Sequence, residues 1–524
     1  MFLQPLLLPL QLLLAQPFTV SMNKKLPALL LISVFVVATC GLIYELIAGT
    51  LASYLLGDSV TQFSTIIGVY LFSMGIGSWV SKYFDKNILS WFIQIEILVG
   101  LVGGFSSTVL FLVFESIASF RIVLYGFVSL TGILVGLEIP LLMRILKDRY
   151  EFKDLVSKVF TFDYIGALLA SLIFPLLLIP HLGLVKTAYL FGLLNVAVAL
   201  IVCLSFKAEI RASKYLQGAS FISIIALLAG FIYADKITSF SESQTYSDTI
   251  IYSKSTPYQR IILTKKNKVL RLFLNGNLQF SSDDEYRYHE ALVHPGLQAL
   301  PFAKHVLVMG GGDGLAVREI LKYPNIDSVT LVDLDKGMTG LFQSNKILLG
   351  LNKNALLSPK VKVINADAFS WIKAQRKKFD FIVIDFPDPS NYAVGKLYTN
   401  AFYKLVKGIL APKGLMVVQS TSPFVAPKSF WTVNKTLESV GLKTIPYHNY
   451  VPSFGEWGYI MATEPDNVYK KPQQYLPGLK FISKESLDLM LYFPKDMGKV
   501  ETDVNKLNNQ ILVKYFEDEW ANVL

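Results

Sequence analysis

Cysteine and histidine are scarce in this chain: its 524 residues include two cysteines and five histidines. Both cysteines, Cys40 and Cys203, lie inside apolar runs, so the polar C-terminal half contains none. That half can therefore form neither a disulfide framework nor a cysteine-based metal site. Charge is also scarce, because Asp, Glu, Lys and Arg make up 17% of the chain and hydrophobic residues 52%. Such a composition excludes an ordinary soluble protein.

The scarcity of charge is concentrated in the first half of the chain. Seven stretches there contain no charged residue: 26–44, 59–81, 97–114, 122–137, 164–180, 187–206 and 215–234. Most of them approach the roughly 20 apolar residues that a helix needs to cross a bilayer. The pattern predicts a multi-pass α-helical membrane domain with about seven spans, and the lipid bilayer as its partner.

The net charge of +10 does not by itself indicate a nucleic-acid-binding protein. Many basic residues lie in short loops between the apolar runs: Lys24, Lys25, Lys82, Lys86, Arg144, Lys147, Arg149, Lys153, Lys207, Arg211 and Lys214. Basic residues resist translocation, so this pattern is typical of the cytoplasmic loops of a membrane protein. We therefore predict a location in the cell membrane and no nucleic-acid partner.

Changes of composition along the chain predict its domain organisation. Residues 1–21 carry three prolines and no basic start, which is unlike a signal peptide. We expect an unstructured extension there, and Met22-Asn-Lys-Lys looks like a more natural beginning. The remaining segments are a transmembrane helical domain at 22–234, a linker at 235–248, a small β subdomain at 249–300, an α/β domain at 301–480 and a helical extension at 481–524.

Short strands and turns follow the linker. Asn275-Gly276 stands between two apolar runs, which is a strong hairpin signal. Asp283 and Asp284 are placed to cap a helix that follows them. From His305, apolar strands alternate with helical segments, and strands are expected at 305–309, 328–333, 361–364, 379–385 and 415–419. This alternation predicts a parallel, doubly wound α/β sheet.

Polar residues and glycines stand at the carboxyl ends of these strands, where such sheets bind their ligands. They are Gly310–Gly314, Asp333, Asp367, Asp385 and Gln419. The glycine turn lets a ligand approach the backbone. Asp333 is suited to pair with ribose hydroxyls, and Asp367 follows the third strand, where the adenine of an adenosyl ligand would lie. Together these ends predict a nucleoside site.

Two carboxylates follow the fourth strand in Val383-Ile-Asp-Phe-Pro-Asp-Pro389. Asp385 and Asp388 would form an acidic entrance to the site. Such an entrance suits a cationic substrate, because each ammonium gains a charge-assisted hydrogen bond. An amine is a nucleophile only when it is neutral, so a carboxylate must accept or orient its proton. The pair therefore predicts transfer chemistry on an amine.

The ordered motifs of this half resemble those of the spermidine synthases, the polyamine aminopropyltransferases. They are Tyr258-Gln259, Asp284-Glu285, Tyr288-His289-Glu290, Val306 to Gly314 with Arg318-Glu319, Asp385 to Pro389 and Val418-Gln419. The similarity covers roughly Ser253 to Thr463. Gly41-Leu-Ile-Tyr-Glu45 and Tyr54 to Phe63 resemble the membrane-attached branch of the same family.

The resemblance implies a Rossmann-like, methyltransferase-type domain with a small β-hairpin subdomain. It implies decarboxylated S-adenosylmethionine as co-substrate, the diamine putrescine as acceptor, and spermidine and 5′-methylthioadenosine as products. It also implies no prosthetic group and no metal, since a neutral amine attacks the methylene next to a sulfonium and a neutral thioether leaves.

The resemblance assigns a role to each site residue. Gln259, Asp333, Asp367 and Ala368 would hold the methylthioadenosine portion, next to the turn with Gly310 and Gly312. His289, Asp313 and Asp388 would hold the amine, Tyr288 would lie between the two substrates, Gln419 would line the amine site, and Asp385 would accept the proton. Four positions depart from the family pattern: Asp333 replaces Glu, Ala368 replaces Gly, Phe454 replaces Tyr and Tyr392 replaces Pro.

Two other functions fit parts of the sequence. The same fold could serve a methyltransferase that uses intact S-adenosylmethionine on a small amine, but Asp385, Asp388 and the Tyr288-His289-Glu290 helix favour a diamine and the decarboxylated donor. A polyamine transporter or sensor is the second alternative, and the full set of donor residues with Asp385 argues against it. A homo-oligomer is compatible with the sequence.

Four acids lie within or beside the apolar runs: Glu45, Glu96, Glu138 and Asp163. Such acids face a bundle interior or a polar cavity, where they either form a path for polyamine cations or bond neighbouring helices. The basic loops place their own end of the bundle in the cytoplasm, and seven crossings would then export the catalytic domain, away from an intracellular donor. We expect a cytoplasmic catalytic domain, with one span re-entrant or the count different by one.

Overall fold

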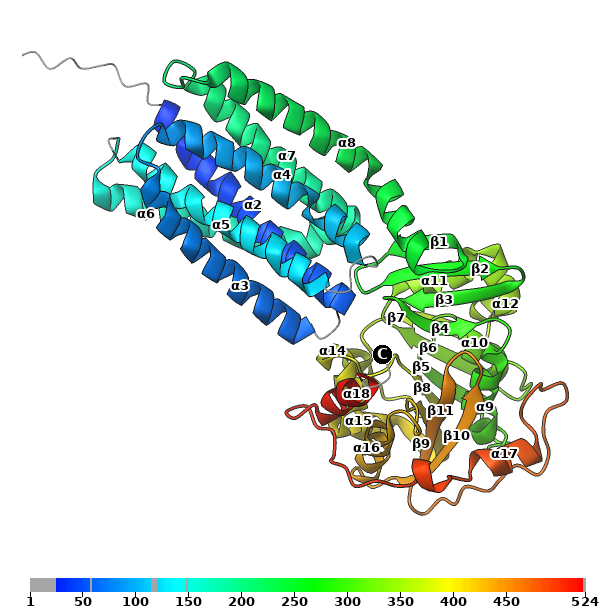
Figure 1. Cartoon of the computed structure of the whole chain (residues 1–524). Helices are drawn as coiled ribbons and strands as arrows, with labels where there is room; N and C mark the ends of the chain where they lie inside the picture. Colours follow the sequence, from blue (N-terminus) through cyan, green and yellow to red (C-terminus); the bar gives the residue numbers. More distant parts are fainter. Residues whose placement is uncertain (1–24, 57–58, 115–119, 148, 522–524) are drawn as a thin grey trace, which may run out of the picture. The chain divides into compact units, whose positions relative to one another are not determined.

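The structure is a computed structural model, and it describes residues 25–56, 59–114, 120–147 and 149–521. The chain divides into two compact units (Figure 1). The first contains the helices before Ser241, and the second contains residues 242–524, which include both β-sheets.

The first unit is built of long apolar helices. They are α2 (Lys25–Leu56), α3 (Ser59–Val80), α4 (Ile88–Phe114), α5 (Phe120–Leu146), α6 (Phe152–Ile173), α7 (Ile179–Ser205) and α8 (Ser213–Thr245). Each charge-free run of the sequence lies in these helices or within a few residues of their ends. The last helix, α8, continues through Thr245, into the segment expected as a linker.

Among the described residues, six helices are long and apolar enough to cross a membrane. One of the six, Phe152–Ser205, has 54 residues and contains two of the seven predicted runs. A π-helical segment, Phe174–Leu178, and the non-helical backbone of Gly183, at φ +71°, interrupt it. Interruptions of this kind bend helices. The predicted count of about seven is recovered only when this element is counted as two crossings.

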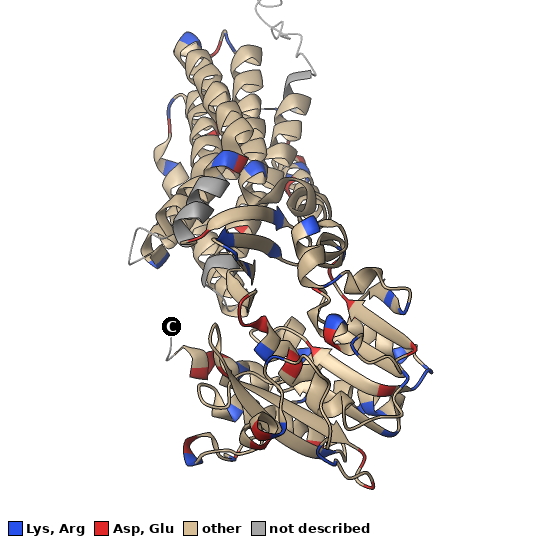
Figure 2. Cartoon of the chain, turned by 90° about the vertical axis from the view of Figure 1, so that its right-hand side faces the viewer, with Lys and Arg blue, Asp and Glu red and all other residues tan. Residues whose placement is uncertain are grey.

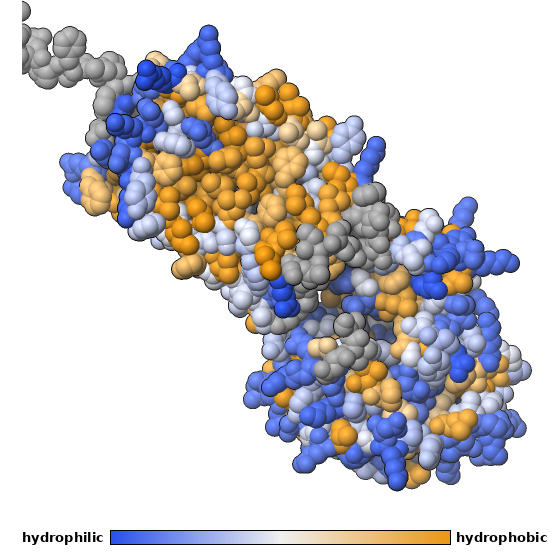
Figure 3. All heavy atoms as spheres, viewed as in Figure 1, coloured by the Kyte–Doolittle hydropathy of each residue, from blue (hydrophilic) through white to orange (hydrophobic). Residues whose placement is uncertain are grey.

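Charge and hydropathy are distributed unevenly over this unit. Lys, Arg, Asp and Glu are sparse along the helices and occur mainly towards their ends (Figure 2). Apolar side chains cover much of the face visible in Figure 3. Large apolar residues such as Phe72, Ile122, Leu176 and Ile222 are exposed. This surface is the reverse of that of a water-soluble bundle, whose helices present polar faces to solvent.

The second unit begins with a four-stranded antiparallel sheet. Its strands are β1 (Thr249–Ser255), β2 (Arg260–Lys266), β3 (Val269–Leu274) and β4 (Asn277–Ser281), paired in chain order. The predicted hairpin is confirmed, because Leu274 pairs with Asn277 across Asn275 and Gly276, which have φ of 50° and 83°. Positive φ at both central residues is what the Asn-Gly signal supplies.

A seven-stranded sheet carries the rest of the unit, in the order β10-β11-β9-β8-β5-β6-β7. The strands are β5 (His305–Gly310), β6 (Ser328–Asp333), β7 (Val361–Asn365), β8 (Phe379–Asp385), β9 (Leu410–Gln419), β10 (Lys443–Val451) and β11 (Gly455–Thr463). The five predicted strands, β5 to β9, are confirmed and are parallel to one another.

The expectation of a wholly parallel sheet is wrong, because β11 pairs antiparallel with both β9 and β10. The physical reason is the short connection between β10 and β11, residues 452–454. A connection of this length permits only an antiparallel hairpin, since parallel strands need a crossover of a dozen or more residues. The sheet is therefore mixed.

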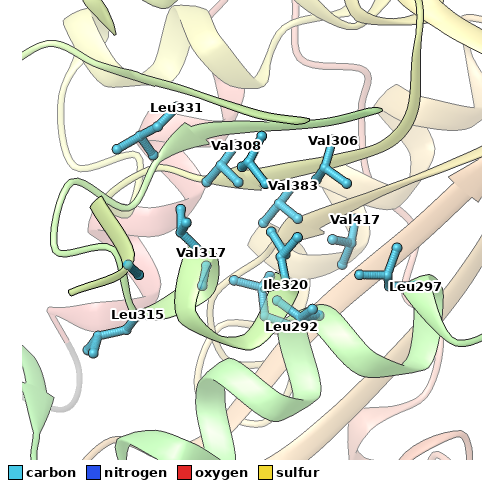
Figure 4. Packing of buried hydrophobic residues seen from close by; sticks show 14 of the residues in the cluster. Leu292, Leu297, Val306, Val308, Leu315, Val317, Ile320, Leu331, Val383 and Val417 are labelled. Atoms are coloured by element: carbon cyan, nitrogen blue, oxygen red, sulfur yellow. The ribbon is translucent and has the colours of Figure 1, made fainter. Parts of the chain in front are cut away.

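Both faces of the large sheet are buried, as a doubly wound fold requires. Val306, Val308, Val383 and Val417 belong to one apolar cluster, and the alternate residues Leu307, Met309, Ile382 and Val418 belong to another. The first face is covered by α9 (Glu285–Leu297) and α10 (Leu315–Ile320), whose Leu292, Leu297 and Ile320 point towards Val383 and Val417 (Figure 4).

Further helices complete the fold. They are α11 (Lys336–Ser344), α12 (Lys346–Leu351), α13 (Ala368–Lys373), α14 (Tyr392–Gly395), α15 (Asn400–Ile409), α16 (Pro427–Glu438), α17 (Lys484–Met490) and α18 (Ile511–Trp520). The predicted capping of α9 differs in detail. Asp284 occupies the N-cap position, but its carboxylate accepts hydrogen bonds from the N–H and O–H of Ser453, at 2.7 and 2.9 Å, instead of capping the helix.

Candidate active site

The glycine turn after β5 brings three strand ends close together. Gly310 and Gly311 have φ of +81° and +63°, a backbone that side chains disfavour. A Cβ on Gly310 would lie 2.1 Å from the Asp385 carbonyl oxygen, and one on Gly312 would lie 2.7 Å from Asp333 Oδ2. Glycine is therefore required here, because the turn contacts the ends of β8 and β6 directly.

Asp333 is the last residue of β6, and its Oδ1 accepts the N–H of Asp335 at 2.8 Å. Burial raises the pKa of Asp333 to about 6. Asp335 was not predicted as a site residue, but its Oδ2 accepts hydrogen bonds at 2.8 Å from both Gln259 Nε2 and Thr256 Oγ1. Gln259 thus joins the small sheet to the N-terminus of α11 through Asp335, at the carboxyl end of β6.

Asp367 and Ala368 stand at the start of α13, after β7. The Asp367 carboxylate is the helix N-cap and accepts the Ser370 N–H at 2.8 Å. Burial acts to raise its pKa, but the Lys396 ammonium, 2.8 Å from Oδ2, and the Ser370 N–H hold that pKa below its usual range. Ala368 is buried beside it. Asp367 is therefore an ionised acceptor at the β7 end of the site.

Asp385 ends β8 and receives a short hydrogen bond, since Tyr288 O–H donates to its Oδ1 at 2.5 Å. Burial raises the pKa of Asp385 to about 6, and nearby Asp313 adds to the rise, while His289 and the Tyr288 hydrogen bond oppose it. This carboxyl group titrates close to neutrality, which suits a proton acceptor that must work near neutral pH.

Asp388 lies beyond Asp385 and is held by Gln419, the last residue of β9. Gln419 Nε2 donates to Asp388 Oδ1 at 3.3 Å and to the Phe386 carbonyl at 2.7 Å. Gln419 Oε1 in turn accepts the Trp457 indole N–H at 3.2 Å. Burial raises the pKa of Asp388 to about 7, and the Gln419 bond lowers it only in part.

His289 is oriented by a buried chain of charged groups. Its Nδ1 lies 2.8 Å from Glu285 Oε2, and Glu285 receives two hydrogen bonds from Arg318, at 2.9 and 2.8 Å. Arg318 Nε also donates to Glu319 at 2.9 Å. Burial lowers the pKa of His289, but the hydrogen bond to Glu285 raises it above its usual range. Glu285 and Arg318 are therefore placed to position His289. Both belong to motifs identified in the sequence, but no role was predicted for either.

Aromatic rings line the same region. The Tyr288 ring lies with its centroid 5.0 Å from that of His289 and 6.1 Å from that of Phe454. The centroids of the Phe454 and Trp457 rings are 5.5 Å apart. Phe454, which replaces the Tyr expected from the family pattern, thus lies beside the predicted amine residues and presents no hydroxyl group.

Three carboxyl groups in this site, all at least half-buried, have no Lys or Arg partner among the described residues. Within the described ranges, no Lys or Arg forms an ion pair with Asp313, Asp385 or Asp388. Asp313 is buried and Asp385 and Asp388 are half-buried. Loss of contact with water raises the pKa of each. Buried carboxylates are normally paired. The arrangement can therefore bind ammonium groups and accept a proton.

The predicted residues fall into two connected groups. Tyr288, Asp385, Asp313 and His289 interact with one another, and Asp388 and Gln419 share a hydrogen bond. The residues predicted to bind the nucleoside lie at the carboxyl ends of β6 and β7. There Gln259 donates a hydrogen bond to Asp335, and Asp367 forms an ion pair with Lys396. The glycine turn connects the sets, since it contacts both Asp333 and Asp385.

Comparisons with known proteins agree with this geometry. The family described as "Spermine/spermidine synthase domain" matches residues 285–472. A polyamine aminopropyltransferase of Leptospira interrogans is 52% identical over 497 residues, which are 94% of this chain and 99% of the relative. Polyamine aminopropyltransferase 2 of Ralstonia nicotianae is 53% identical over 505 residues, 95% of this chain and 99% of the relative.

Among solved structures, a spermidine synthase in complex with the transition-state analogue AdoDATO is 25% identical, with a TM-score of 0.42. It covers 48% of this chain and 88% of its own. The relatives from Leptospira and Ralstonia match nearly end to end, helical unit included. On these matches the chain belongs to the polyamine aminopropyltransferase family, and it is a transferase.

Proposed function

We propose that this enzyme transfers the aminopropyl group of decarboxylated S-adenosylmethionine to putrescine, giving spermidine and 5′-methylthioadenosine. The observation that carries this proposal is a set of three aspartates that form no Lys or Arg ion pair among the described residues. Asp313 is buried in the glycine turn, and Asp385, which contacts that turn, and Asp388 are half-buried. Each diamine or donor ammonium that enters this set replaces a missing counter-charge.

The chemistry follows from the positions of the carboxylates. The neutral nitrogen of putrescine attacks the methylene carbon next to the donor sulfonium, and the carbon–sulfur bond breaks towards sulfur. Before the attack, the substrate ammonium gives one proton to Asp385, whose pKa of about 6 leaves it ionised at pH 7.5. The ammonium that the attack forms leaves with the product. Tyr288 O–H, 2.5 Å from Asp385 Oδ1, holds the carboxylate in place for this transfer.

The remaining residues position the two substrates. Asp388, held by Gln419, is placed to bind the distant ammonium of the diamine. His289 and Asp313 bind the amine side, with His289 oriented by Glu285. Asp333, with Gly310 and Gly312 next to it, binds the ribose, and Asp367 and Ala368 bind the adenine side. Gln259 supports the nucleoside site through Asp335.

Product analysis tests this function against the methyltransferase alternative. The purified full chain would receive putrescine with either decarboxylated or intact S-adenosylmethionine, and the products would be identified by mass spectrometry. We expect spermidine and 5′-methylthioadenosine with the decarboxylated donor alone. Methylated putrescine from the intact donor would support the methyltransferase and contradict the proposal.

We also propose that the helical unit is a multi-pass membrane domain and that the catalytic unit faces the cytoplasm. Six helices of sufficient length and their exposed apolar residues support insertion. An intracellular donor favours a cytoplasmic active site, whereas the basic loops with seven crossings favour the opposite side. A C-terminal green fluorescent protein fusion decides between them: fluorescence supports a cytoplasmic catalytic unit, and activity of an alkaline phosphatase fusion contradicts it.

A further inference from the structure

The interior of the helical unit contains a polar cluster that the catalytic chemistry does not use. It consists of Glu96 in α4, Glu138 in α5 and Asn195 in α7, whose exposed fractions are 0%, 1% and 0%. Asn195 Nδ2 donates to Glu96 Oε2 at 3.1 Å, and Glu138 lies near enough to Glu96 for the two carboxyl groups to interact. Two interacting carboxyl groups buried in apolar surroundings cannot both be ionised, so the pair holds at least one proton.

The cluster has more hydrogen-bond acceptors than the surrounding protein has donors for them. Within the described residues, Glu96 Oε1, Glu138 Oε1 and Asn195 Oδ1 receive no hydrogen bond from a protein donor. The buried hydroxyl of Tyr44 is likewise without a partner in that part of the chain. A buried acceptor without a donor is unfavourable. If these residues served only to join helices, the acceptors would be matched by donors on the neighbouring helices.

Glycines fix α4 and α7, two of the three helices that carry this cluster, at short separation. A Cβ on Gly100 would lie 2.8 Å from the Gly192 carbonyl oxygen, and one on Gly192 would lie 2.6 Å from that of Gly100. Backbone contact between α4 and α7 therefore occurs one helical turn from Glu96 and about one turn from Asn195. Small residues permit this close approach, which holds the polar side chains in register.

We propose that Glu96, Glu138 and Asn195 bind a primary ammonium group, the charged end of a diamine or polyamine. An alkylammonium has three N–H donors, which match the three open acceptors. On binding, the ammonium takes the place of one proton held by the pair, and that proton leaves to solvent. The net charge of the buried cluster is unchanged by this exchange, so no additional charge is placed in apolar surroundings.

The oxygen atoms of this cluster suit an ammonium group better than a metal ion. Among the described residues there is no group of three or more His, Cys, Asp and Glu side chains that could hold a metal. Hard metal ions are bound by larger sets of oxygen ligands. The proposal rests on the proposed function in one respect, that the enzyme meets diamines and polyamines. The same site would accept the ammonium of the diamine substrate or that of the polyamine product. Separate titrations with the two amines distinguish these ligands.

Carbodiimide labelling tests the site in the full chain, reconstituted in lipid nanodiscs. Dicyclohexylcarbodiimide modifies protonated carboxyl groups in apolar surroundings, and mass spectrometry gives the modification rate at Glu96 and Glu138. At ten times the half-protecting concentration of spermidine or putrescine, we expect the rate to fall about tenfold by mass action. Separate titrations of the two amines identify which one the site prefers.

Three controls make the result decisive. Potassium chloride at equal ionic strength should not protect, and Asp388→Ala, which acts on the catalytic amine site, should leave the protection unchanged. Glu45→Gln, which removes a carboxyl group of α2 outside the cluster, should also leave it unchanged. Equal labelling with and without amine overturns the proposal. So does protection by potassium chloride, or protection that disappears in Asp388→Ala.

A binding measurement avoids dependence on labelling chemistry. With labelled spermidine, we expect about two sites per wild-type chain and one in Glu138→Gln, since only the helical site is removed. A single site in the wild type overturns the proposal, as does an unchanged count in Glu138→Gln. Neither experiment requires turnover, so failure of the helical site is distinguishable from failure of the proposed transferase reaction.

Discussion

Tyr288 O–H donates a hydrogen bond to Asp385 Oδ1 over 2.5 Å, and it joins helix α9 to the end of strand β8. The two residues are 97 positions apart in the chain. The bond stabilises the ionised form of Asp385 and partly offsets the effect of its burial. The proton acceptor of the proposed reaction is therefore tuned by a residue on a separate element.

Tyr288→Phe tests that relationship. Loss of the hydroxyl removes an interaction that lowers the pKa of Asp385 from a value already raised to about 6. A hydrogen bond to a charged group is worth about 1.5–3 kcal/mol, so we expect the acid limb of kcat to move up by about one to two pH units. The measurement is the pH profile of kcat. Tyr447→Phe is the matched control, because its hydroxyl bonds the Ala291 carbonyl in the core, and an equal displacement in both variants would contradict this role.

Asp388→Ala should weaken binding of the acceptor. Asp388 is half-buried and accepts a hydrogen bond from Gln419, and in the proposed reaction it binds the distant ammonium of the diamine. Losing a charged hydrogen bond costs about 1.5–3 kcal/mol, so the KM for putrescine should rise roughly ten- to a hundredfold, with donor affinity unchanged. A monoamine of equal length should be a poor substrate of the wild type and should lose little more. Equal losses for both amines would show that Asp388 supports the loop only.

Stability of the ligand-free enzyme should depend on pH through the same residue. The folded-state pKa of Asp388, about 7, lies above the usual range of an aspartate. The folded state therefore binds this proton more tightly than the unfolded state, so the stabilisation is present at acid pH and is lost as pH rises towards 7. Asp388→Asn avoids this loss of stability, because the amide has no proton to release as the pH rises. We expect a higher Tm than wild type at pH 8 and a smaller difference at pH 5, measured by thermal unfolding, whereas a lower Tm at pH 8 would refute the assignment.

Glu285→Gln tests the orientation of His289. The variant removes the charge that raises the His289 pKa and that pairs with Arg318. We expect kcat/KM for the amine to fall about tenfold, on the scale of a lost charged hydrogen bond, and its pH profile to change. Glu290→Gln is the control on the same helix, because Glu290 accepts backbone N–H groups of residues 480–482. A control with the same altered pH profile would show a general effect of helix α9.

Local patterns in the sequence were sufficient to place the parallel strands and their polar ends. Asp333, Asp385 and Gln419 are the last residues of their strands in the structure. Hydrophobic runs bounded by Gly, Asp or Asn carry this information, because a strand buried on both faces ends where polarity begins. The strands β10 and β11 were not predicted, and their antiparallel pairing came from a three-residue connection that has no Asn-Gly or Asp-Gly signal.

Contacts between distant segments account for what the sequence did not predict. Asp335 receives Gln259 across 76 positions, and Arg318 reaches Glu285 across 33. No periodicity or local spacing reports such pairs, since they depend on how the sheets and helices pack. In the helical unit, the break at Gly183 lies between the charge-free runs 164–180 and 187–206, three residues before Lys186. The sequence therefore marked the place of this break, whereas the backbone geometry there was not predicted.

The most direct test of the central claim is the single-turnover rate of spermidine formation, measured from pH 5 to pH 8 with both substrates saturating. In the wild type we predict a rate that rises with pH around a midpoint near 6, the pKa to which burial raises Asp385. Asp385→Asn should lower the rate by about 10²-fold, the scale of general-base loss, and remove the midpoint. Asp380→Asn, in the same strand, should retain both, because among the described residues its carboxylate accepts hydrogen bonds from the backbone N–H groups of Lys304 and His305. A pH-independent wild-type rate, or an Asp385→Asn variant that keeps the midpoint, would contradict the account.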